Sequence, residues 1–119
     1  MAKERRKYKR VPTCNVISYV GLDENGRPME EGMGTTVDLS QGGALIETSR
    51  PIDADIVLLS TIDQQKNIIE IKCRVVHRRT LGPAKHLTGI EFADNADAVN
   101  RIVKHFILDY HGRKEKVLR

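Results

Sequence analysis

The sequence has few aromatic residues: its 119 positions hold no Trp, two Phe and three Tyr. Val, Ile and Leu must therefore supply most of the buried apolar surface, and a chain of this length fits one domain with one modest core. The apolar segments also lack a row of aromatic side chains on which the bases of a single-stranded nucleic acid could stack.

Long hydrophobic runs are missing too. No apolar run is long enough to cross a bilayer, and the N-terminus has no segment of the signal-peptide type, so we expect a cytoplasmic protein without membrane insertion. Cysteine is scarce: Cys14 and Cys73 lie far apart, and neither has a second Cys or a His at a short metal-ligand spacing before it. Cys73 and His77 lie four residues apart but lack further ligand partners. The two could form one disulfide, but a cytosolic chain disfavours it. We interpret both as small buried apolar residues.

Motifs for catalysis are absent. The sequence has no HExxH or GxSxG pattern, and it has no phosphate-binding loop ending in Gly-Lys-Ser or Gly-Lys-Thr. The four histidines are scattered, and none lies in a motif with a nucleophile: His77, His86, His105 and His111. We therefore predict that the protein is not an enzyme and that it uses no cofactor and no metal.

The charge is unevenly distributed. The net charge is +4, yet residues 1–10 carry six basic side chains against one acidic, and residues 113–119 carry four against one. The polar residues 1–12 cannot bury enough apolar surface to fold alone. The sequence thus divides into a flexible basic arm (1–12), a domain (13–112) and a basic tail (113–119). Basic ends on an acidic body suggest an anionic ligand or partner, and solvated tails without a partner are the alternative.

Short segments rich in β-branched residues alternate with turn signals along most of the chain. The clearest alternation, in residues 68–79, places four apolar residues on one face: Ile69, Ile71, Cys73 and Val75. The polar residues 27–32 follow a turn signal at Asn25-Gly26 and are predicted as a connection. Six strands are predicted: 14–22, 33–37, 44–47, 55–61, 68–79 and 85–92.

Helix is predicted only at the end, where apolar residues recur at helical spacing from Ala96 to Tyr110. Asp94 or Asn95 can cap its start, and Gly112 would end it. The apolar stripe needs a surface to cover, most simply the open end of a small barrel. Six short strands followed by one helix indicate a mainly β fold, a small antiparallel β-barrel.

One turn segment is unusual. Residues 38–43 read Asp-Leu-Ser-Gln-Gly-Gly and lie between two predicted strands. Asp38 and Ser40 are separated by one residue, so both side chains can point to the same face of an extended segment. A tight turn here would use Gly42 or Gly43 for a positive φ. Taken alone, the segment fits an ordinary Asx or Ser turn as well as it fits a ligand site.

The basic arm reads Arg-Arg-Lys-Tyr-Lys-Arg over residues 5–10. Arg6 and Arg10, separated by three residues, can close over a dianionic ligand. A guanidinium binds phosphate oxygens bidentately and also matches the O6/N7 edge of guanine. A generic basic tail that contacts RNA or DNA nonspecifically is the alternative.

Together, Arg6-x-x-x-Arg10 and the later Asp38-x-Ser40-x-x-Gly43 resemble the motifs of the PilZ domain family. The resemblance covers nearly the whole chain and includes a late Thr-Gly-Ile-Glu-Phe segment and the C-terminal helix. It implies a small antiparallel split barrel of about six strands with one C-terminal α-helix. It further implies that the protein binds the bacterial second messenger cyclic di-GMP.

The family motifs imply a role for each matching residue. Arg6 and Arg10 would grip phosphates and guanine edges. Asp38 and Ser40 would hydrogen-bond a guanine, and a carboxylate suits the paired N1 and N2 donors of that base. Gly43 would permit close packing of the backbone.

Arg5 lies just before the arginine motif, where the resemblance implies capture of a stacked pair of cyclic di-GMP molecules. The implied mechanism is that the arm, residues 1–12, orders over the barrel face and so signals to a separate downstream protein. The runner-up function is a small barrel that binds single-stranded RNA or DNA through its basic arms. A third is a protein-interaction module that binds no nucleotide.

Overall fold

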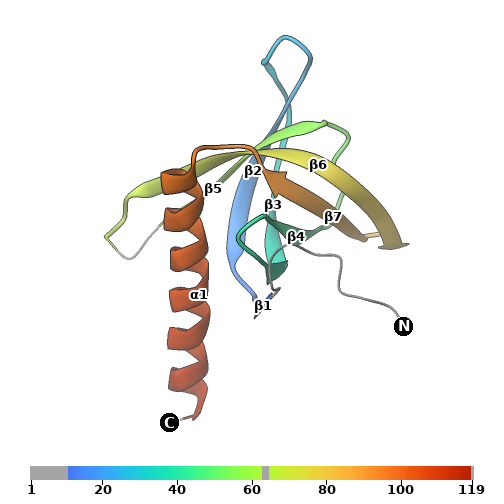
Figure 1. Ribbon diagram of the computed structural model, residues 1–119. Coiled ribbons are helices and arrows are strands. Elements are labelled where there is room, and N and C mark those ends of the chain that lie inside the picture. Colours follow the sequence, from blue (N-terminus) through green and yellow to red (C-terminus); the bar gives the residue numbers. More distant parts are fainter. Residues whose placement is uncertain (1–10, 63–64, 119) are drawn as a thin grey trace, which may run out of the picture.

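The computed structural model describes residues 11–62 and 65–118. Seven strands form one antiparallel sheet in the order β1-β3-β2-β5-β6-β7-β4, and pairing of β3 with β4 closes six of them into a barrel (Figure 1). The elements are β1 (Val11–Pro12), β2 (Val16–Leu22), β3 (Pro28–Leu39), β4 (Gly43–Thr48), β5 (Ile56–Ile62), β6 (Ile68–Gly82), β7 (Lys85–Phe92) and α1 (Ala96–Leu118). The prediction of a mainly β barrel with one C-terminal helix is confirmed.

The hairpin between β2 and β3 is longer than the sequence suggested. The turn forms as predicted: Gly26 has a φ of 78°, and the Asp23 carboxylate accepts hydrogen bonds from the backbone N–H groups of Asn25 and Arg27. The prediction of a connection at 27–32 was wrong, because residues 28–32 pair with β2. Glu31 lies on the exposed face of this strand, and the half-buried Glu30 carboxylate accepts hydrogen bonds from the backbone N–H groups of Asp53 and Ala54, so both polar side chains are compatible with a strand.

The core fills the barrel interior with aliphatic side chains. The predicted alternation in β6 is confirmed, with Ile69, Ile71 and Cys73 buried. Burial raises the pKa of the Cys73 thiol to about 12, so this thiol stays protonated at neutral pH. The prediction that Cys14 is buried was wrong. Its neighbours Thr13 and Asn15 point inward, and successive side chains of an extended segment face opposite sides.

The helix α1 begins where the sequence placed it. The side-chain oxygen of Asn95 accepts a hydrogen bond of 2.9 Å from the backbone N–H of Ala98, which is an N-cap. The prediction that Gly112 ends the helix was wrong, because α1 continues to Leu118. Glycine permits a left-handed helix end but does not impose one. Within the described part of the chain, no helix is long and apolar enough to cross a membrane.

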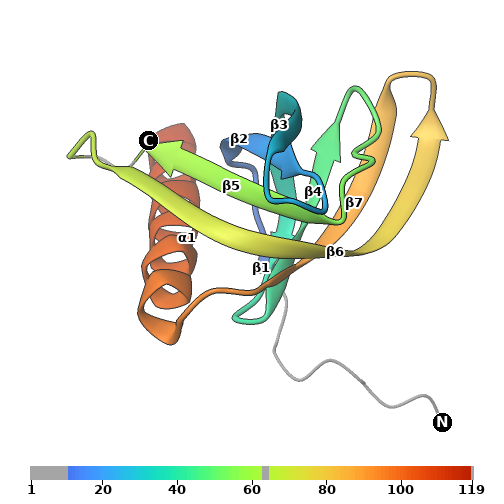
Figure 2. The same cartoon turned by 90° about the horizontal axis from the view of Figure 1, so that it is seen from above.

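The helix covers one side of the barrel and leaves another side open. Ile102, Val103 and Phe106 of α1 are buried in the common core. In both views the helix lies on the side away from the β6–β7 hairpin (Figures 1 and 2). The outer face of β4, β7 and the second half of β6 therefore stays uncovered by the helix, and the candidate site lies there.

Candidate functional site

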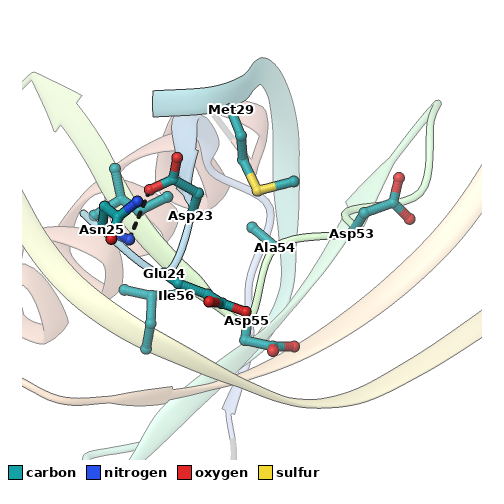
Figure 3. Close-up of a pocket in the computed structure, with 9 residues that line it drawn as sticks. Asp23, Glu24, Asn25, Met29, Asp53, Ala54, Asp55 and Ile56 are labelled. Carbon is teal, nitrogen blue, oxygen red and sulfur yellow. Dashed lines mark hydrogen bonds between the residues drawn. The ribbon is translucent and has the colours of Figure 1, made fainter. Parts of the chain in front are cut away.

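Two hollows on the surface of the described residues differ in their lining, and the larger of these two is acidic. It has a volume of about 550 Å³ and lies beside the β2–β3 hairpin and the segment before β5 (Figure 3). Four carboxylates line it, those of Asp23, Glu24, Asp53 and Asp55, and its lining includes no basic residue. Such a lining repels an anionic ligand. No three His, Cys, Asp or Glu side chains within residues 11–62 and 65–118 are grouped so that they could hold a metal ion.

The second hollow has a different chemistry. Its volume is about 250 Å³, and it lies over the outer face of β3, β4, β7 and β6. Its lining combines aliphatic side chains with one carboxylate, one imidazole and one guanidinium: Leu45, Leu87, Asp38, His77 and Arg79. A mostly apolar surface with a few convergent polar groups is typical of a small-molecule site.

The strand register places two polar residues of this hollow, Asp38 and His77, in one row. Asp38 of β3 pairs with Leu45 of β4, Leu45 pairs with Gly89 of β7, and Gly89 pairs with His77 of β6. Paired residues of neighbouring strands point to the same face. Asp38 and His77 therefore lie at opposite ends of one row, which crosses four strands on the outside of the barrel.

Two β-bulges create this row. Thr36 pairs with Ile46, and both side chains point into the barrel. Strict alternation would point the Asp38 side chain inward as well, but the register shifts between Thr36 and Asp38. The register of β6 shifts in the same way between Val75 and His77. An extra residue in one strand reverses the facing of every residue after it. Both bulges thus bring a polar side chain to the outer face.

Close packing requires a glycine at position 43 and leaves little room for a side chain at position 89. A Cβ added at Gly43 would lie 2.0 Å from the carbonyl oxygen of Ile90, so β4 and β7 approach too closely there for any side chain. A Cβ at Gly89 would lie 3.1 Å from the Cβ of His77, so the two residues pack closely across the β6–β7 pair. The prediction of a positive φ at Gly42 or Gly43 was wrong, since Gly26 alone among the described glycines has one.

Ser40 has a local role in the turn between β3 and β4. Its hydroxyl accepts a hydrogen bond of 3.2 Å from the backbone N–H of Gly42 and donates one of 3.4 Å to the carbonyl of Gly43. The Ser40 backbone N–H donates a further bond of 2.8 Å to the same carbonyl. Asp38 lines the hollow, whereas Ser40 is not among the lining residues.

The N-terminal segment reaches the site through β1. Val11 pairs with Leu39, and Pro12 pairs with Asp38. A buried polar network fixes the chain just after this point. Its hydrogen bonds join Thr13, Asn15 and Thr36. The predicted ligand residues Arg5, Arg6 and Arg10 lie outside the described residues.

Comparison with known proteins establishes the family. The family model described as PilZ domain matches residues 4–109. The chain belongs to the PilZ domain family. Among curated proteins, none matched the sequence.

Solved structures agree with this assignment. The PilZ domain of YcgR from Escherichia coli, solved with c-di-GMP, is 12% identical with a TM-score of 0.65, covering 97% of this chain and 98% of that one. The PilZ domain of CeSA from a cellulose-synthesising bacterium is 23% identical with a TM-score of 0.57, covering 80% of this chain and 94% of that one. The complex of K. pneumonia MrkH with c-di-GMP is 21% identical with a TM-score of 0.61, covering 94% of this chain but 56% of MrkH. At these identities the likeness establishes the fold.

In this PilZ domain, sequence reasoning found Asp38 but missed His77, Arg79 and Gly89. A signal for the first two was present. Val75 and Val76 are adjacent β-branched residues that interrupt the alternation of β6, and a run of polar and basic residues follows them. A break of this kind is typical of a β-bulge.

Proposed function

We propose that this PilZ domain is a cytoplasmic receptor for cyclic di-GMP, which binds against the hollow that Asp38 lines, beneath the arginine arm of residues 1–12. The observation that carries the proposal is the pairing of Pro12 with Asp38. It joins the base of the arm to the strand that presents the carboxylate. The c-di-GMP complexes of YcgR and MrkH, two PilZ-like structures, support the choice of ligand.

Chain geometry allows both motif arginines to reach the hollow. Consecutive Cα atoms are about 3.8 Å apart, and six extended residues span at most roughly 22 Å. Arg10 is two residues before Pro12, and Arg6 is six residues before it. Both guanidinium groups can therefore reach a ligand that contacts Asp38.

The hollow is too small to enclose the ligand by itself, so the proposed role of the arm is to cover it. At about 250 Å³ it lies below the range of about 300–1,000 Å³ that is typical of pockets that enclose a ligand. A cyclic dinucleotide would need a second covering surface, which the arm supplies. Ordering the arm costs conformational entropy, and the charge-assisted hydrogen bonds to phosphate must offset it. The altered surface is then read by a separate partner protein, and no chemical step is needed.

The decisive experiment is a calorimetric titration with cyclic di-GMP. We expect saturable binding in the micromolar range or tighter, about −8 kcal/mol or more favourable. GMP and GTP should compete poorly, because they lack the paired arrangement of guanines and phosphates. A single-stranded oligonucleotide titrated in parallel tests the nucleic-acid alternative. The absence of heat with cyclic di-GMP at high protein concentration and low salt would exclude the proposal.

The Arg6→Ala and Arg10→Ala variants test the arm. Each should weaken cyclic di-GMP binding by about 1.5–3 kcal/mol, because each removes a charged hydrogen-bond donor. Thermal unfolding should barely change, since both residues precede the barrel. An early unfolding transition in either variant would show that the arm is a structural element.

Replacement of Asp38 tests the proposed hydrogen bonds between this carboxylate and guanine. Asp38→Ala should weaken binding, and Asp38→Asn should weaken it less, because the amide keeps one acceptor oxygen for the guanine donors. Titration calorimetry measures both, with melting curves as the control for folding. Equal losses for the two variants would show that Asp38 does not act as a hydrogen-bond acceptor for the base.

Arg5 should determine the stoichiometry. A stacked pair of ligands carries four phosphate charges, and a third guanidinium helps to neutralise them and can stack on an outer guanine. We expect two ligands per chain in the wild type and a shift towards one, or weaker binding, in Arg5→Leu. A calorimetric end point near one ligand per wild-type chain would contradict this prediction. Wild-type behaviour of Arg5→Lys would show that Arg5 contributes only charge.

A further inference from the structure

The outer face of β6 carries two side chains that the family motifs leave unused. His77 and Arg79 both follow the bulge after Val75, and they pair with Gly89 and Leu87 of β7. Both side chains are exposed, and both line the same hollow as Asp38. The hollow therefore has an acidic wall on β3 and a basic wall on β6.

Arg79 differs from the other arginines of its strand. Arg74 forms an ion pair with Glu91. Arg78 reaches Asp55 at 3.1 Å and also donates to backbone carbonyls of the segment before β5. Within residues 11–62 and 65–118, the Arg79 side chain forms no hydrogen bond and no ion pair, while its backbone pairs with Leu87 of β7. Its guanidinium is thus available to a ligand without first breaking a contact.

Gly89 shapes the centre of the hollow. It has no side chain, and it lies between Leu45 and His77 in the row that ends at Asp38. A Cβ at this position would lie 3.1 Å from the Cβ and 3.9 Å from the Cγ of His77, so the His77 side chain starts directly beside the glycine. An aromatic ring such as that of His77, next to a position without a side chain, offers a surface on which a base can stack.

We infer that His77 and Arg79 form the second wall of the nucleotide site, with His77 stacking on a guanine and Arg79 binding a phosphodiester oxygen. The inference rests on the proposed function and deepens it. A guanine over Gly89 points its donor edge at Asp38. Arg79 lies two residues beyond His77, roughly 7 Å further along the strand, which is where the sugar–phosphate chain leaves the base.

The test compares two arginines of the same strand by titration with cyclic di-GMP. Arg79→Ala should weaken binding at least about tenfold at low salt, and the loss should shrink as salt is raised, because salt screens the contact with phosphate. Arg74→Ala is the matched control: it removes the same charge from the same strand but lies outside the hollow, and it should change the affinity less than about twofold. Melting curves should be close to wild type for both.

Two variants of His77 test the stacking contact. His77→Ala should weaken binding by about tenfold, whereas His77→Phe keeps a flat ring and should bind within about threefold of wild type. Equal losses for the two variants would overturn the stacking role. A loss in Arg79→Ala that does not depend on salt would overturn the phosphate contact and indicate an acceptor edge of guanine instead.

The outcomes separate this inference from the proposed function. Without wild-type binding, both fail. If the wild type binds and Arg10→Ala loses binding, but Arg79→Ala matches Arg74→Ala, the second wall is overturned and the receptor function stands.

Discussion

Gly43→Ala is expected to remove a large part of the stability of this PilZ domain. The added Cβ would lie 2.0 Å from the Ile90 carbonyl oxygen and 3.2 Å from the Cα of Glu91. Both atoms belong to the backbone of β7, which pairs with β4 at this point, so neither can rotate away. The strands must separate, and overpacking of this kind costs about 3 kcal/mol or more. Chemical denaturation should show this loss, and melting should shift by roughly 12 °C or more.

Gly82→Ala is the matched control for this prediction. A Cβ at Gly82 would meet no atom within 4 Å, and its backbone is not in the left-handed region. Its stability should stay within about 0.5 kcal/mol of wild type. Similar stability of the two variants would show that β4 and β7 do not approach closely. In that case the only role left for Gly43 would be the close contact with the ligand that the family motif implies.

Phe106→Ala should be similarly damaging, but through the helix. Among the residues whose side chains the structure describes, Phe106 is the largest that is fully buried, with an exposed fraction of 0%. It lies in the same cluster as Ile102 and the strand residues, so its removal leaves a cavity where α1 joins the barrel. Loss of a buried Phe costs about 3–5 kcal/mol, a large share of the 5–15 kcal/mol typical of a domain. Equilibrium unfolding in urea measures this change.

Lys104→Ala on the same helix provides the comparison. Lys104 is exposed, so its replacement should change the free energy of unfolding by no more than about 0.5 kcal/mol. A Phe106 variant as stable as the Lys104 variant would mean that α1 does not contribute to the core. Below their melting transitions, both variants should still bind cyclic di-GMP, because neither residue lines the hollow.

The sequence by itself determined the features that depend on local physics. The alternation of Ile69, Ile71 and Cys73 set the inner face of β6, since side chains of a strand alternate with period two. Gly26 defined a turn and Asn95 a helix start, because positive φ and N-capping depend on the residue itself and its nearest neighbours. Asp38 was found as a candidate ligand residue because it belongs to a short motif.

The tertiary structure alone decided where these pieces meet. The bulge before His77 turns that residue and Arg79 outward, against the continued alternation of the sequence. The stabilising contacts of a bulge or a register lie between strands that are distant in the chain, so no local propensity specifies them. The same reason applies to Gly43, whose constraint comes from β7, and to Pro12, which pairs with Asp38 although the two are far apart in the sequence.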